Sequence, residues 1–137
     1  MQPLKELLLQ EELTCIVLHQ NQLYKEKSDG ILPLFHFIEQ GVLQESELAD
    51  KVVGKAAALL MVYGGIHRVH ACLISQHALH IFQKYHVHVT YDTLVPYIIN
   101  RNHDGMCPIE QAVLTCDSFD DAYSILKAKL QQMQIKR

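Results

Sequence analysis

Residues 66–92 read IHRVHACLISQHALHIFQKYHVHVTYD, and this stretch decides the expected fold. Residues 66–74 have the composition of a buried strand, and residues 87–92 alternate polar and apolar side chains with the period of two that is typical of a strand. Between them, residues 76–86 form an amphipathic helical pattern whose inward positions are Ala78, Leu79, Phe82 and Tyr85. Such a strand–helix–strand unit joins two parallel strands of a sheet that is covered on both faces.

The segment before this unit is expected to be the buried central helix. Residues 50–63 are apolar on nearly every side of a helix, and Gly64 and Gly65 follow as a C-terminal stop. Further upstream, leucines at helical spacing predict a short helix over residues 4–8. The polar break at Gln20 and Asn21, between two strand-like runs, predicts an antiparallel hairpin.

Three more helices complete the expected order of elements. Pro33 near the start and Gly41 after the end mark a short helix over residues 34–40. After a polar loop over about residues 93–106, a helix begins near Pro108, and a last one begins at Ser118, which forms a capping-box pattern with Asp121. The prediction is a three-layer α/β/α sandwich with a mixed sheet, formed by residues 1–137 as a single domain.

Composition excludes several classes of protein. Hydrophobic residues make up 49% and charged residues 20% of the 137 residues, which is typical of a folded domain rather than a disordered chain. A net charge of -3 argues against extended nucleic-acid binding. No apolar stretch approaches the roughly 20 residues of a membrane span, and the acidic start is unlike a secretory signal, so a cytoplasmic protein is expected. Four cysteines without a C-x-x-C pair are expected to be free thiols.

Lys51 and Lys55 form the first candidate site. In a helix that begins at Asp50 they would oppose the positive end of the helix dipole, a cost that calls for an explanation. Both ammonium groups, together with the free amides of the helix start, could hold a phosphate or carboxylate. An i,i+4 pair between Glu47 and Lys51, with Lys55 solvated, is the alternative.

Cys107 forms the second candidate site, at the end of the polar stretch 100–110. If Pro108 is the first helical residue, Cys107 takes the N-cap position and its thiol lies against unpaired amides, which favours a reactive thiolate. A packed cysteine that simply begins a helix is the alternative.

Nine histidines raise the question of a metal site. The pairs His86/His88 and His77/His80 could each present two imidazoles on one face, but neither has an evident third ligand, so no metal is expected there. The sequence also has no Walker A loop, dinucleotide-binding glycine motif, nucleophile elbow or H-E-x-x-H motif, which removes most common enzyme classes.

The stretches ADKVVGKAAALL (49–60), VYGG (62–65), VPYIINR (95–101) and GMCPIE (105–110) resemble a small prokaryotic family of unknown function with a cytidine-deaminase-like fold. Zinc deaminases carry H-x-E or C-x-E at the start of one central helix and P-C-x-x-C at the next. The matching places here hold Asp50-Lys51 and Ser75-Gln76-His77-Ala78. We therefore expect no zinc-dependent deamination and no cofactor.

In such a fold the helix starts converge beside the carboxyl ends of the strands, where α/β proteins usually bind ligands. The resemblance thus implies a pocket for a small anionic or nucleotide-like ligand. Candidates for chemistry there are Asp50, Lys55 and Cys107. Candidates for ligand binding are Lys51, Ser75, Asn100, Arg101 and Glu110.

The alternative is a non-catalytic binding or assembly module. Deaminase-like domains commonly form homo-oligomers, and contact area could come from a sheet edge or from the apolar helix near Phe35 and Phe37.

Overall fold

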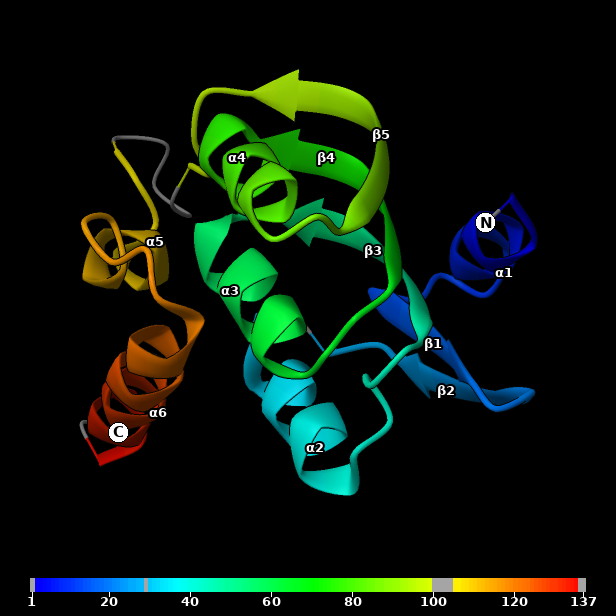
Figure 1. The fold of residues 1–137 in the computed structure, drawn as a ribbon, viewed down its shortest axis with the longest axis horizontal. Coiled ribbons are helices and arrows are strands. Elements are labelled where there is room, and N and C mark those ends of the chain that lie inside the picture. Colours follow the sequence, from blue (N-terminus) through cyan, green and yellow to red (C-terminus); the bar gives the residue numbers. More distant parts are fainter. Residues whose placement is uncertain (1, 29, 100–104, 136–137) are drawn as a thin grey trace.

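The chain forms a mixed five-stranded sheet with helices on both faces (Figure 1). The computed structural model describes residues 2–28, 30–99 and 105–135. In chain order the elements are α1 (Gln2–Gln10), β1 (Cys15–His19), β2 (Gln22–Glu26), α2 (Leu32–Gln40), β3 (Glu47–Val53), α3 (Lys55–Tyr63), β4 (Arg68–Ser75), α4 (Gln76–Lys84), β5 (His88–Val95), α5 (Pro108–Ala112) and α6 (Phe119–Ile135).

The strands lie in the order β2-β1-β3-β4-β5. β1 is antiparallel to β2 and to β3, whereas β3, β4 and β5 run parallel to one another. The hairpin turns at Gln20 and Asn21, whose φ angles of 50° and 65° suit the tight turns that join twisted strands. The α/β class, the mixed sheet and the parallel pair joined by α4 are confirmed, although β5 continues past the predicted end to Val95.

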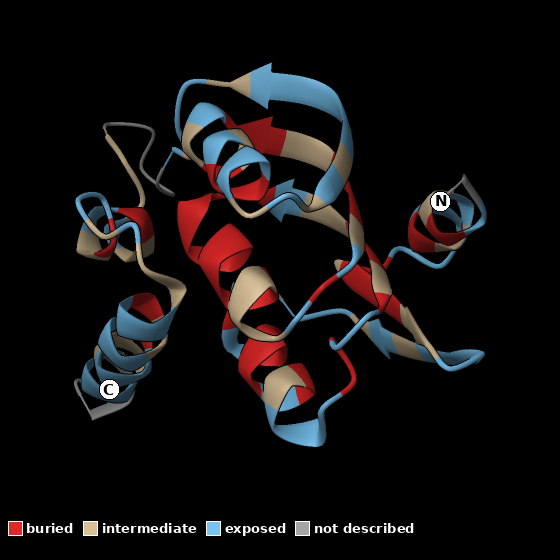
Figure 2. Ribbon diagram, viewed as in Figure 1, coloured by how far each residue is buried: buried red, intermediate tan, exposed pale blue. Residues whose placement is uncertain are grey.

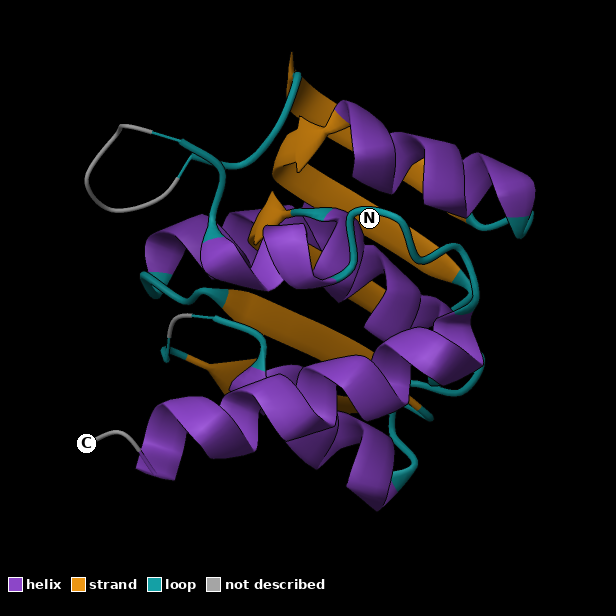
Figure 3. Ribbon diagram, turned by 90° about the vertical axis from the view of Figure 1, so that its left-hand side faces the viewer, coloured by secondary structure: helices purple, strands orange, loops and turns teal. Residues whose placement is uncertain are grey.

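The helices form separate layers around the sheet. α1 packs on β1 and β3 from one face, while α2, α3 and α4 cover the other face (Figure 1). α6 packs against α3, and Figure 3 shows strands of the sheet behind these helices. α3 is the buried centre of this layer, with residues 55–61 all buried (Figure 2).

The prediction of one helix over residues 50–63 is wrong in its first part. Residues 50–53 belong to β3, which pairs with β1 on one side and β4 on the other, and α3 begins only at Lys55. Val52 and Val53 stand directly before the apolar residues of α3, so periodicity alone could not separate the end of the strand from the buried helix that follows. Gly54, expected inside the helix, is the junction between the two elements.

The aromatic residues of α2 are also placed differently from one expectation. Phe35 and Phe37 are 5% and 6% exposed and belong to the main hydrophobic core. Their own side chains therefore offer little surface to another molecule, and contact through other residues of α2 stays a prediction.

Candidate functional site

Two of the sequence motifs meet at the start of α3. Glu110 of α5 places its carboxylate there: Oε1 accepts a hydrogen bond from the Lys55 N–H at 2.6 Å, and Oε2 accepts one from the Ala56 N–H at 2.9 Å. The first N–H groups of a helix have no partner within the helix and form the positive end of its dipole, so a carboxylate is stabilised there. An anion is therefore bound at this helix start, and the chain itself supplies it.

Glu110 is only 7% exposed. Burial raises its pKa, while the hydrogen bonds from Ala56 and Lys55 act in the opposite direction. Loss of water around the carboxylate is the larger of these opposing effects on its pKa.

Gly54 is what allows Glu110 to approach so closely. A Cβ atom on Gly54 would lie 2.5 Å from Glu110 Cδ and 2.8 Å from Oε2. Both distances are shorter than the non-bonded contacts that Cβ atoms make in proteins. The backbone of Gly54 is extended, with φ −98° and ψ −177°, so the glycine is needed for space rather than for an unusual dihedral angle. The glycine of the first motif and the glutamate of the second thus form one packing unit.

Lys55 does not project into solvent. Its Nζ donates to the backbone oxygen of Leu114 at 2.8 Å and lies 3.2 Å from Asp117 Oδ1, and its side chain is 6% exposed. The hydrogen bond and the charge of Lys55 lower the pKa of Asp117. The ammonium group therefore ties α3 to the segment after α5.

Ser75 lies at the start of α4, where the comparison with the second zinc-deaminase motif placed it. It is fully buried, and its Oγ accepts a hydrogen bond from the Ala78 N–H at 3.1 Å, the geometry of an N-cap. The hydroxyl has a structural partner at this helix start.

Asp50 and Lys51 lie within β3 rather than at a helix start. Asp50 is directly opposite Cys15 on β1, and its Oδ1 accepts a hydrogen bond from the Val52 N–H at 3.3 Å. Burial raises the pKa of Asp50 from 3.8 to about 7, and burial together with the charge of Asp50 raises the pKa of the Cys15 thiol. The strand thus holds a thiol and a carboxyl group in contact on the α3 side of the sheet.

Cys107 takes the N-cap position of α5, and Pro108 is the first helical residue, as predicted. Its N–H donates to the backbone oxygen of Ile98 at 3.0 Å, but its side chain makes no capping hydrogen bond. Asn100 and Arg101 lie outside the described residues. Ligand binding by this group of residues stays a prediction.

A different cluster was missed by the sequence reasoning. It consists of His70, Cys72 and Asp92, whose ligand atoms lie within 4.8 Å of one another. The pairs His77/His80 and His86/His88 do not belong to it. The available signal was the H-x-C spacing at residues 70–72, which places both side chains on one face of a strand. Asp92 could not be added without knowing how β4 and β5 pair.

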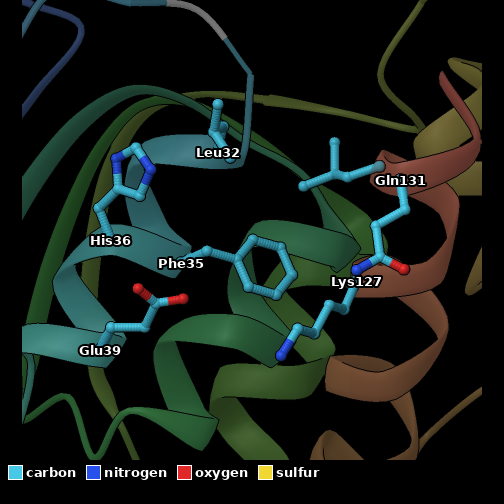
Figure 4. A pocket seen from close by; sticks show the side chains of 7 residues that line it. Leu32, Phe35, His36, Glu39, Lys127 and Gln131 are labelled. Carbon is cyan, nitrogen blue, oxygen red and sulfur yellow. The ribbon is translucent and has the colours of Figure 1, made fainter. Parts of the chain in front are cut away.

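A shallow pocket of about 170 Å³ lies between α2 and α6 (Figure 4). Figure 4 shows Phe35 and Glu39 reaching it from α2 and the oppositely charged Lys127 from α6. The full lining is Leu32, Phe35, His36, Glu39, Lys127, Leu130 and Gln131.

The order and direction of the strands, with helices on both faces, define an α/β protein built on a mixed five-stranded sheet. Within the described ranges 2–28, 30–99 and 105–135, no helix is long and apolar enough to cross a membrane. The chain belongs to the family described as "TM1506: Domain of unknown function (DUF1893)", whose model matches residues 3–130. This confirms the expected membership of a family of unknown function.

A solved structure supports the same assignment. The crystal structure of a DUF1893 family protein, TM1506 from Thermotoga maritima, superposes with a TM-score of 0.84 at 25% sequence identity. The match covers 96% of this chain and 88% of that one. A search of curated proteins finds no match.

Proposed function

We propose that this protein is a non-catalytic binding and assembly module on a cytidine-deaminase-like scaffold. The order of elements supports the scaffold: a helix and hairpin precede three helix–strand units, α2–β3, α3–β4 and α4–β5, an order that agrees with a deaminase-like domain. The observation that carries the proposal is the Glu110 carboxylate on the first amides of α3. It fills the place where a ligand of such a fold would meet the helix start.

The charges around α3 support the same conclusion. The ammonium group of Lys55 is engaged with Leu114 and Asp117, and Ser75 caps α4. A phosphate at the start of α3 would have to displace a buried carboxylate that already makes two hydrogen bonds. A pocket for a small anionic or nucleotide-like ligand, with Cys107 among its predicted residues, is the second candidate and requires that displacement.

The edge strand β5 is the surface that we assign to assembly. β5 is last in the strand order, most of its residues are exposed (Figure 2), and an edge strand presents unpaired N–H and C=O groups. Large exposed apolar side chains are concentrated on and just after it: Tyr91, Leu94, Tyr97 and Ile99. This combination is typical of a surface that pairs with another strand.

A second copy of the chain is the partner that fits this edge. Two copies of one strand can pair antiparallel about a two-fold axis, which makes the interface self-complementary. The only formally charged residue among the eight of β5 is Asp92, and its Oδ1 is paired with Lys5 Nζ at 3.0 Å. Like-charge repulsion between two β5 strands is therefore small.

Measurement of molar mass by light scattering after size exclusion tests the proposal. We expect a dimer for the unmodified chain, a monomer for Leu94→Lys, and a dimer for the control Leu9→Lys, which alters a similarly exposed leucine of α1. A monomeric unmodified chain, or a dimer that survives Leu94→Lys, contradicts assembly through β5. Saturable binding of inorganic phosphate or cytidine monophosphate to the unmodified chain in calorimetry would instead favour the second candidate.

A further inference from the structure

The cluster of His70, Cys72 and Asp92 lies on the face of the sheet covered by α1, opposite α3. Alternation along β4 places His70 and Cys72 on the same face, and Cys72 packs against the smaller hydrophobic core under α1. Asp92 is brought beside them by the parallel pairing of β4 with β5, in which Ala71 pairs with Tyr91 and Leu73 with Thr93. The three ligand atoms lie within 4.8 Å of one another.

We propose that His70, Cys72 and Asp92 form a binding site for a divalent transition-metal ion of the zinc class. An imidazole nitrogen, a thiolate sulfur and a carboxylate oxygen are the ligands that Zn²⁺ takes from proteins, whereas Mg²⁺ and Ca²⁺ prefer oxygen alone. Bond lengths of roughly 2.0 to 2.3 Å place two ligands of a tetrahedral ion about 3.5 Å apart. His70 Nε2 and Asp92 Oδ2 already lie 3.4 Å apart.

The surroundings of His70 orient it for coordination. His70 is 7% exposed, and its Nδ1 lies 2.7 Å from Thr90 Oγ1. With the proton on Nδ1, the ring donates to Thr90, and the lone pair of Nε2 faces Asp92 Oδ2. A ring nitrogen held in this way by a second partner is the usual arrangement of a metal-binding histidine.

Asp92 has one oxygen for each of two partners. Oδ1 lies 3.0 Å from Lys5 Nζ, and Oδ2 faces His70. Lys5 can therefore keep its contact while Oδ2 binds the ion. The Asp92 side chain is 40% exposed, so water can reach the fourth coordination position.

Protons compete with the metal at this site. Two acceptor atoms such as Nε2 and Oδ2, facing each other at 3.4 Å, need a proton or a cation between them. Coordination would also require the Cys72 thiol to lose its proton to the buffer as the sulfur–metal bond forms. Without a metal, the same residues would form only a polar network of Lys5, Asp92, His70 and Thr90.

Zinc titration of the full chain against a chromophoric chelator tests the site. We expect one zinc ion per chain, with affinity lowered at least about tenfold by Cys72→Ser and also lowered by Thr90→Val. Cys116→Ser, which removes a half-buried thiol outside the cluster, should leave the affinity unchanged. If Cys72→Ser does not fold, as judged by circular dichroism, Asp92→Asn takes its place because Asp92 is exposed.

Cobalt provides a readout of the ligands themselves. The Co²⁺ form should show the near-ultraviolet sulfur-to-cobalt charge-transfer band in the unmodified chain and in Cys116→Ser, but not in Cys72→Ser. Failure of the unmodified chain to hold zinc against the chelator would overturn the proposal. So would equal zinc affinity in Cys72→Ser and the unmodified chain, or a cobalt spectrum without the thiolate band.

Discussion

Removal of the Glu110 carboxylate tests whether this side chain stabilises the fold by accepting hydrogen bonds from the first N–H groups of α3. Glu110→Ala deprives the Lys55 and Ala56 N–H groups of acceptors at 2.6 and 2.9 Å. Hydrogen bonds to charged groups contribute roughly 1.5 to 3 kcal/mol each, and relief of the buried carboxylate offsets part of that sum. We expect the free energy of unfolding to fall by about 2 to 4 kcal/mol in urea denaturation, with an unchanged m-value.

Two comparisons show whether the loss arises from the missing anion. Glu6→Ala, at an exposed site in α1, should change the free energy of unfolding by less than about 0.5 kcal/mol. Added acetate should restore part of the stability of Glu110→Ala, because it can bind the vacated amides, and should not stabilise the unmodified chain beyond a chloride control. A loss below about 0.5 kcal/mol in Glu110→Ala would refute the reasoning.

Three further outcomes are expected. Gly54→Ala should lower the free energy of unfolding by about 1 to 3 kcal/mol, because its Cβ would lie 2.5 Å from Glu110 Cδ. Gly105→Ala is the control, because a Cβ there meets nothing within 4 Å and should leave the stability nearly unchanged. Equal urea midpoints for the two variants would contradict the clash. Ser75→Ala should cost about 1 kcal/mol through loss of the α4 cap, and an unchanged thermal midpoint would argue against that role. Burial raises the pKa of Asp50 to about 7 in the folded chain, against 3.8 for an ordinary Asp. The free energy of unfolding should therefore be highest below about pH 4 and should fall as pH rises to about 7, by at most about 4 kcal/mol. Asp50→Asn should remove this pH dependence from urea denaturation, and the same pH dependence in both proteins would contradict the prediction.

The two motifs of the candidate site were visible in the sequence, but their relation was not. Glu110 was expected to face a ligand, and Gly54 was expected to lie inside a helix. In the structure the two residues are in contact: the Glu110 carboxylate caps α3, and the missing side chain of Gly54 leaves room for it. No local pattern reveals a contact between residues this far apart in the chain.

The division between β3 and α3 shows the same limit at the level of secondary structure. Val52 and Val53 lead directly into the apolar run of α3, and the position of β3 between β1 and β4 is what makes residues 50–53 a strand. By contrast, the hairpin turn at Gln20 and Asn21 depends on local backbone preferences, and it was predicted correctly.

Local chemistry was therefore enough to predict the α/β class, the α4 crossover and the N-cap position of Cys107, because each depends on residues close together in the chain. Only the tertiary structure decided that the carboxylate of Glu110 occupies the start of α3, and that β4 and β5 bring Asp92 beside His70. The physical reason is that helix periods, turns and caps act over a few residues, whereas strand register and packing between helices act across the whole chain.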